Sequence, residues 1–244
     1  MRLDIRQLPG TSSLVRDYVH AFSRLGAFFA GNPHAPDAYR EQAEQRDACG
    51  YRPSELRDAL LVRNDAWNAP PIVRERIEEL AQPRALAVVT GQQTGLFGGP
   101  LFTLYKAFTT VELAARLRKE LGRPVIPVFW MASEDHDVAE ADHVHLLDRT
   151  GSLVTLRHAS WASPIGFIPA NLRLGPAIRE TLEQVWELLP PTEFVPSLRE
   201  ALDRAFAPER TLAEAFAHWM VHLLGGSGLV LADGADPALK RLAA

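Results

Sequence analysis

A strand, a glycine-rich loop and a helix follow one another between residues 85 and 106, which read ALAVVTGQQTGLFGGPLFTLYK. The apolar run at its start predicts a buried strand over 85–90, and four glycines mark the loop that follows. Pro100 suits the first turn of a helix, because its missing N–H would have no helical partner there. A helix is therefore expected over 100–121. Loops of this kind bind anions, since the loop amides and the helix dipole both point at the ligand.

The expected helix is followed by a second apolar strand. Its predicted buried face consists of Leu101, Leu104, Tyr105, Phe108, Val111, Ala115 and Leu117. Residues 125–132 (VIPVFWMA) are continuously apolar, as expected for a strand that helices cover on both sides. Strand, helix and strand together predict a βαβ unit. We therefore expect the α/β class, with a Rossmann-like parallel sheet, a helical N-terminal region and insertions.

The remaining segments add helices, a hairpin and a third strand. Helices are predicted over 12–30, 53–65, 70–82, 177–189, 196–206 and 209–224, and a hairpin over 143–148 and 152–157. Residues 228–234 (GLVLADG) indicate a further buried strand that ends in an acid and a glycine. We expect residues 1–83 to form a helical region packed on the core. Residues 84–244 then form the first part of a Rossmann-like core, with an insertion at 143–225.

Composition and charge exclude several classes of function. The net charge is -4, from 26 basic and 30 acidic residues that are mixed along the chain, so the basic stripe of a nucleic-acid-binding protein is missing. No apolar run approaches the roughly 20 residues of a membrane span, and the N-terminus lacks the apolar centre of a signal peptide. Cys49, the one cysteine, fits a reducing compartment. We expect a soluble cytoplasmic protein without nucleic-acid or membrane partners.

The glycine-rich loop is the first candidate site. It lacks the Gly-Lys-Ser/Thr ending of a Walker loop and the G-x-G-x-x-G spacing of a dinucleotide-binding loop. Lys106 lies two turns into the helix, and helical side chains lean toward the N-terminus, so its ammonium can reach an anion held by the loop. The alternative is a structural turn with a solvated lysine. The candidate substrate- or phosphate-binding residues are Gly91, Gln92, Gln93, Thr94, Gly95, Gly98, Gly99 and Lys106.

A second polar cluster directly follows the apolar strand and reads Ser133-Glu134-Asp135-His136-Asp137. Ligands of open parallel sheets bind outside the carboxyl ends of the strands. Both clusters follow strands of one βαβ unit, so we expect them at one edge of the sheet, facing one crevice. The candidate catalytic residues are Glu134, Asp135, His136 and Asp137, which are expected to transfer protons next to a bound anion. The alternative is that Ser133 caps a helix and the acids complement its dipole.

Histidines near this cluster raise the question of a metal. His143 and His145 alternate along a predicted strand and share one face, with Asp142 and His136 nearby in the sequence. Such a group can bind a divalent cation. An H-E-x-x-H motif or a cysteine-rich spacing is missing, however, and histidines are common on surface hairpins. We therefore assign no metal.

The segments TGQQTGLFGGPLFTLYKA (90–107) and PVIPVFWMASEDHDVAEADHVHL (124–146) resemble the BshC family, the cysteine-adding enzymes of bacillithiol biosynthesis. The resemblance continues in ERTLAEAFAHWMVHLLGGSGLVLADGADPALKRLA and around residues 8–18, so it spans the chain. It implies that the loop from Gly91 to Gly99, with Lys106, matches the family's anion-binding turn. Glu134, Asp135, His136 and Asp137 match its acid–histidine motif.

The resemblance implies a ligase that joins the carboxyl of L-cysteine to the amine of glucosaminyl-malate. It also implies a nucleotidyltransferase-type Rossmann core, followed in longer members by a C-terminal coiled coil that forms a homodimer. We expect that coiled coil to be absent from residues 1–244. Amide formation from a free carboxylate is uphill in water, so ATP is the expected activating co-substrate. His136, with an acidic neighbour, is expected to deprotonate the amine.

Two other readings of the same residues stay open. The anion-binding loop also suits a nucleotidyl or glycosyl transferase that binds a sugar nucleotide. The shorter length also suits a catalytically silent fragment.

Overall fold

The structure is a computed structural model, and it describes residues 4–49, 53–135, 137–158, 161, 168 and 170–243. The chain forms two compact units, Met1–Tyr51 and Arg52–Ala244. It therefore divides at residues 51 and 52 rather than at the expected 83 and 84. The reason is that α3 (Pro53–Ala66) and α4 (Pro71–Leu80) bury their apolar residues against the sheet.

The smaller unit consists of short helices. They are α1 (Ser13–His20), α2 (Pro36–Asp47) and the 3₁₀ turns η1 (Ile5–Gln7), η2 (Phe22–Arg24) and η3 (Gly26–Phe28). The predicted helix over 12–30 is wrong beyond α1, because Ala21 leaves the helical conformation at φ -143° and ψ 46°. The break lets the rings of Tyr18, Phe22 and Phe29 pack together, with centroids 5.2–5.7 Å apart.

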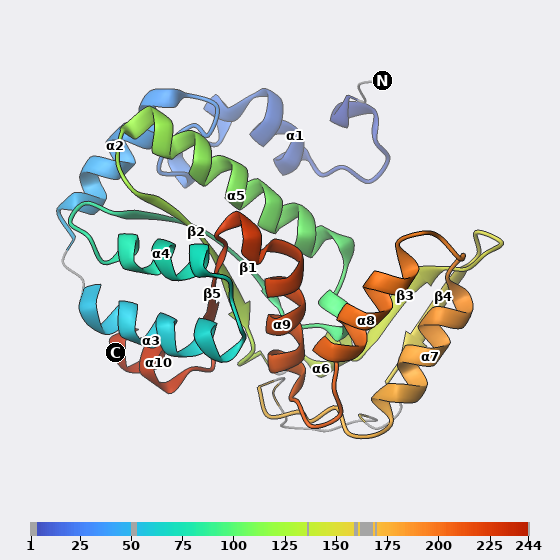
Figure 1. Ribbon diagram of the computed structural model, residues 1–244. Coiled ribbons are helices and arrows are strands. Elements are labelled where there is room, and N and C mark those ends of the chain that lie inside the picture. Colours follow the sequence, from blue (N-terminus) through green and yellow to red (C-terminus); the bar gives the residue numbers. More distant parts are fainter. Residues whose placement is uncertain are drawn as a thin grey trace. The chain divides into compact units, whose positions relative to one another are not determined.

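The larger unit is built on a parallel sheet with the strand order β1-β2-β5 (Figure 1). These strands are β1 (Leu86–Gln93), β2 (Val125–Ala132) and β5 (Val230–Asp233). The central strand, β2, is buried over most of its length, as its continuous apolar run predicted. The expected α/β, Rossmann-like class is confirmed, and β1 extends beyond its predicted end to Gln93.

Helices cover both faces of this sheet. Ile126 and Val128 of β2 pack with α3 and α4, and α10 (Pro237–Ala243) lies beside α3. Phe129 and Met131 pack instead with α5 (Leu101–Leu121) and α9 (Leu212–Leu224). Alternate residues of a strand point to opposite faces, so the two groups of helices lie on opposite sides.

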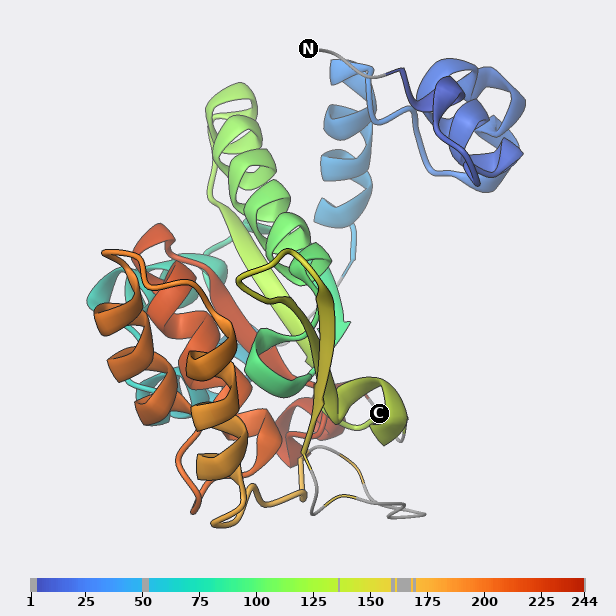
Figure 2. The same cartoon turned by 90° about the vertical axis from the view of Figure 1, so that its right-hand side faces the viewer.

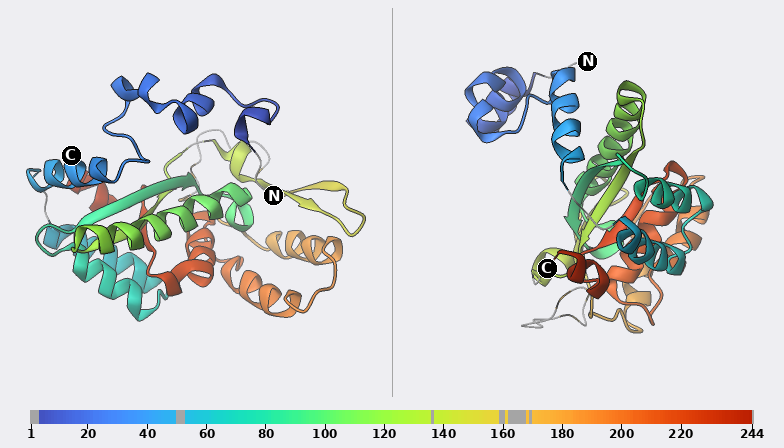
Figure 3. Two further views of the ribbon diagram at one scale, coloured as in Figure 1. Left: turned by 90° about the horizontal axis from the view of Figure 1, so that it is seen from above. Right: turned by 90° about the vertical axis from the view of Figure 1, so that its left-hand side faces the viewer.

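Between β2 and β5 the chain forms a hairpin and three longer helices, as predicted. The elements are α6 (Val138–Ala141), β3 (His143–Leu147), β4 (Leu153–Arg157), α7 (Ile178–Leu188), α8 (Val195–Ala205) and α9, followed by the 3₁₀ turn η6 (Gly225–Ser227). Figure 3 shows the hairpin, α7 and α8 at one end of the unit and α3 and α4 at the other. No helix in the described ranges is both long and apolar enough to cross a membrane.

Helix α5 forms over the expected residues but buries a different face. Leu101, Tyr105 and Phe108 were predicted to be buried and are 64%, 62% and 52% exposed. Leu117 is buried as predicted, but the other buried side chains are Thr103, Ala107, Thr110 and Ala114, which were not predicted to be. Most of these are small, so the helix lies close against β1 and β2. Hydrophobic periodicity located the helix, but it did not identify the face whose small side chains fit against the sheet.

Candidate functional site

The three parallel strands end at one edge of the sheet, and each end carries a polar side chain. Strand β1 ends at Gln93, Ser133 follows β2, and β5 ends at Asp233. In the register of the sheet, Gln93 lies opposite Ala132, and Met131 lies opposite Asp233. Polar residues from three separate segments therefore meet where open α/β sheets bind their ligands.

The glycine-rich motif and the acidic motif are in direct contact at the ends of β1 and β2. Gln93 Nε2 donates a hydrogen bond of 2.8 Å to Asp135 Oδ2. The Asp137 amide donates to Asp135 Oδ1 at 3.1 Å, so both carboxylate oxygens are held. The expectation that the two motifs share one edge is confirmed. His136, the imidazole of the predicted site, lies outside the described residues.

Lys106 reaches from α5 back to the end of β1. Its Nζ donates to Gln92 Oε1 at 2.8 Å and to the Gly91 carbonyl oxygen at 3.3 Å, and it lies 5.3 Å from the centre of the Phe102 ring. The side chain is partly buried, so the alternative of a freely solvated lysine does not hold. Both oxygens are neutral groups, so neither contact is an ion pair and an anionic group would be a stronger partner.

The glycine-rich loop is a tight turn whose own backbone uses two of its amides. The amides of Gly98 and Gly99 donate to the carbonyl oxygens of Gly95 and Leu96 at 3.2 and 3.0 Å. The turn needs glycine at position 98, where φ is 99° and a Cβ would lie 3.0 Å from the Trp219 ring. The amides of Gly98 and Gly99 are therefore already used inside the turn. Figure 2 shows the β3–β4 hairpin running beside this segment.

Three buried polar atoms around this edge have no hydrogen-bond partner among the described residues. They are Thr94 Oγ1, Thr103 Oγ1 and Glu134 Oε2. The two threonines are fully buried and lie on either side of the glycine-rich turn. A buried polar atom without a partner costs about 1–3 kcal/mol, so such atoms call for a ligand or a water that completes them. The sequence predicts Thr94 and Glu134 as site residues, whereas it predicts Thr103 only as part of a helix.

The end of β5 carries a polar group whose residues were noted in the sequence but were not assigned to the site. Ser133 Oγ donates to Asp233 Oδ1, and the Ala235 amide donates to both oxygens at 3.1 and 3.0 Å. Ser133 thus joins β2 to β5, so the alternative that it caps a helix is excluded. Gly234 leaves room for Glu134, since a Cβ there would lie 1.9 Å from Glu134 Oε2. The available signal was Asp233 itself, an acid at the end of an apolar strand.

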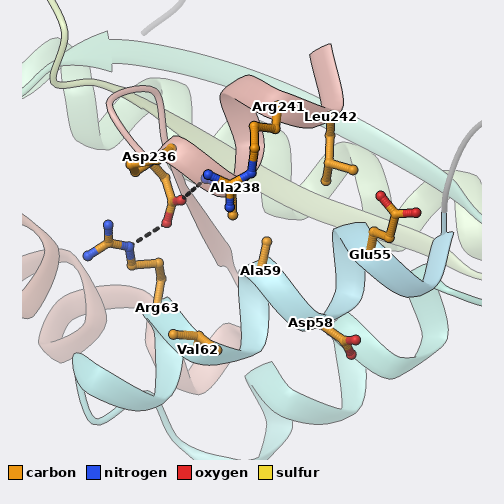
Figure 4. Close-up of a pocket in the computed structure, with 10 residues that line it drawn as sticks. Glu55, Asp58, Ala59, Val62, Arg63, Asp236, Ala238, Arg241 and Leu242 are labelled. Carbon is orange, nitrogen blue, oxygen red and sulfur yellow. Dashed lines mark hydrogen bonds and ion pairs between the residues drawn. The ribbon is translucent and has the colours of Figure 1, made fainter. Parts of the chain in front are cut away.

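A cavity of about 720 Å³ lies between α3 and α10 (Figure 4). Arg63 and Asp236 meet at one end of it, with Glu55 at the other. Burial favours a raised pKa for Asp236, but hydrogen bonds from Arg63 and from the Ala238 amide outweigh it, and the pKa lies below its usual range. The cavity lies between helices, and its buried acid is already paired. We therefore do not assign the reaction to it.

The hairpin histidines are engaged in local contacts. His143 Nδ1 lies 3.0 Å from Asp142 Oδ1, and His145 Nδ1 lies 2.8 Å from Thr155 Oγ1. Asp142 also receives a hydrogen bond from Arg157. Within the described ranges, no group of three or more His, Cys, Asp or Glu side chains is placed to hold a metal ion.

The sequence is similar to that of known proteins over its whole length. The family profile described as "Bacillithiol biosynthesis BshC, N-terminal Rossmann-like domain" matches residues 1–244. The protein named "Putative cysteine ligase BshC" from Salinibacter ruber is 36% identical over 229 residues, which are 93% of this chain and 41% of that protein. The protein of the same name from Koribacter versatilis is 37% identical over 244 residues, 99% of this chain and 44% of that protein. The chain spans less than half the length of these relatives.

Proposed function

The chain belongs to the BshC family of bacillithiol biosynthesis, as its N-terminal Rossmann-like domain, and from this premise we propose that it joins L-cysteine to glucosaminyl-malate. The proposal rests on one observation: at the end of β1, Gln93 contacts Asp135 and the adjacent Gln92 contacts Lys106, each at 2.8 Å. It places a cation and a carboxylate at one edge of the sheet. A ligase for an anionic amine and an amino acid needs both charges.

Lys106 is the group that binds an anion in this proposal. Glucosaminyl-malate offers malate carboxylates, and ATP offers phosphate oxygens. In the proposal, either oxygen replaces Gln92 Oε1, which now accepts from Lys106 at 2.8 Å. A carboxylate or phosphate oxygen binds an ammonium more strongly than a neutral amide oxygen does, so the exchange is favourable.

In this proposal, Asp135 and His136 accept the proton that the amine of the substrate loses. The amine of glucosaminyl-malate is protonated at neutral pH and must lose a proton before it attacks. Gln93 and the Asp137 amide hold Asp135 in place, and His136 is its neighbour in the chain. The amine nitrogen then forms a bond to the carboxyl carbon of cysteine, and one C–O bond of that carboxyl breaks.

ATP is the co-substrate that the proposal requires. When bound, it supplies the phosphoryl or nucleotidyl group that turns a carboxyl oxygen into a leaving group. The hydroxyls of Thr94 and Thr103, which have no partner among the described residues, and the ammonium of Lys106 are the donors that fit phosphate oxygens. The amides of Gly98 and Gly99 are not available for this role. We place the reaction in the reducing cytoplasm, in a homodimer of the kind that the family resemblance implies.

Bacillithiol synthesis by the purified protein in its natural length tests the proposal. Cysteine, glucosaminyl-malate and ATP are supplied, and the product is followed by mass spectrometry. We expect Lys106→Met and Asp135→Asn each to lower kcat by about 100-fold or more. Lys119→Met, an exposed position in the last turn of α5, is the matched control and keeps the normal rate.

The outcomes separate the competing functions. Transfer from a sugar nucleotide, without bacillithiol synthesis, would show a transferase instead. A protein that melts cooperatively but has no activity with either set of substrates would be a silent fragment. Normal synthesis by both Lys106→Met and Asp135→Asn would contradict the assigned site.

A further inference from the structure

A second cavity, of about 310 Å³, opens at the end of β5. Residues of α3, α9 and α10 line it together with the end of the strand. Two of the lining side chains are basic, Arg63 and Lys240, and two are acidic, Asp233 and Glu214. The buried indole of Trp67 forms part of the wall. The cavity thus combines both signs of charge with an apolar surface.

The basic side chains have donors to offer to a ligand. Arg63 uses Nε to bind Asp236, and Figure 4 shows its two terminal nitrogens directed away from that carboxylate. The hydrogen bond to Asp236 raises the pKa of Arg63, so the guanidinium stays charged. The Lys240 ammonium makes no hydrogen bond or ion pair with any residue in the described ranges. A planar guanidinium beside an ammonium is suited to a carboxylate.

The acidic side chains are fixed in place by backbone amides. Asp233 Oδ1 accepts from Ser133 and from the Ala235 amide, and no described residue donates to its Oδ2. Glu214 Oε2 accepts from the Thr211 amide at 2.8 Å, in the capping box of α9. Each acid therefore has one oxygen that is already held and one that remains for a ligand. Carboxylate oxygens of this kind are suited to an ammonium.

We propose that this cavity binds the α-amino acid substrate, with its carboxylate at Arg63 and Lys240 and its ammonium at Asp233 and Glu214. This rests on the proposed function, in which that amino acid is cysteine. Holding the ammonium between two acids keeps it protonated, so the amino acid does not react with itself. Ser133 joins this cavity to the proposed reaction site at the end of β2, because it binds Asp233 and is followed directly by Glu134 and Asp135.

Binding of L-cysteine to the purified protein, measured by calorimetry, tests the cavity. We expect Lys240→Gln and Glu214→Gln each to raise the Kd about tenfold or more, the loss of one hydrogen bond between charged groups. Glu214→Gln keeps an oxygen for the Thr211 amide, so the helix cap is retained. The exposed Lys119→Gln, in the last turn of α5, is the control and keeps the normal Kd.

Two cysteine analogues assign each end of the ligand. Lys240→Gln should weaken 3-mercaptopropionate, which has the carboxylate, and leave the weak binding of cysteamine unchanged. Glu214→Gln should do the opposite, because cysteamine has only the ammonium. Unchanged cysteine binding in both variants would overturn the proposal, as would equal losses for both analogues.

Bacillithiol synthesis separates this proposal from the proposed function. If the natural protein makes bacillithiol while both variants keep its KM for cysteine, the cavity is not the cysteine site and the ligase function stands. If cysteine binds with the expected pattern but no bacillithiol forms, the cavity is an amino-acid site and the ligase function fails.

Discussion

The β1–β2 end and the β5 end of the sheet carry similar polar residues but hold them differently. At the first end, Lys106 and Asp135 each contact the neutral side-chain amide of a glutamine, at 2.8 Å. At the second end, Asp233 is buried and tied to Ser133, and the buried Asp236 is paired with Arg63. A neutral partner positions a charge without cancelling it. The first end can therefore exchange these contacts for contacts with a ligand. The second end keeps its contacts, which join the strands, and offers a ligand only its remaining donors and oxygens.

Replacement of Asp233 should break this comparison most clearly. Asp233→Ala leaves the buried Ser133 hydroxyl without its acceptor and the Ala235 amide with only one of its two, so we expect the free energy of unfolding to fall by about 3 kcal/mol. The matched change Asp135→Ala, at a partly buried position with a glutamine partner, should cost about 1 kcal/mol. Denaturant unfolding measures both. Equal losses at the two ends would show that the distinction is wrong.

A smaller effect is expected on the helix that positions Lys106. Ala107 is fully buried against the sheet, so Ala107→Leu should overpack this contact and lower the free energy of unfolding by about 1–3 kcal/mol. Phe108→Ser changes the neighbouring exposed position and should stay within about 0.5 kcal/mol. If the larger loss came from Phe108→Ser, the outer face of α5 would be the packed one, as the periodicity predicted.

The sequence predicted the β1–β2 end because its signals are local. Polar residues that directly follow apolar strands suffice to place Gln93 and Asp135 at one edge. Asp233 obeys the same rule but stands alone after its strand, without a neighbouring motif to mark it. Arg63 and Lys240 reach this edge from helices, and Arg63 lies 173 residues from its partner Asp236. No local pattern contains such a contact.

Two helices show the same limit of prediction from local sequence patterns. Periodicity located α5 but not its buried face, because packing against the sheet selects side chains by size as well as by hydrophobicity. The helix expected over 12–30 ends early, because its apolar residues pack as a turn of aromatic rings instead of along one helix face.

The most direct measurement of the site is the nuclear magnetic resonance spectrum of the side-chain amides of Gln92 and Gln93 during titration with glucosaminyl-malate. We expect both NH₂ signals to shift, because the ligand replaces the contact of Gln92 with Lys106 and binds next to Asp135, the partner of Gln93, and we expect Lys106→Met to abolish the shifts. Shifts confined to the cavity between α3 and α10, around Ala59 and Ala238, with both glutamines unchanged, would contradict the assignment.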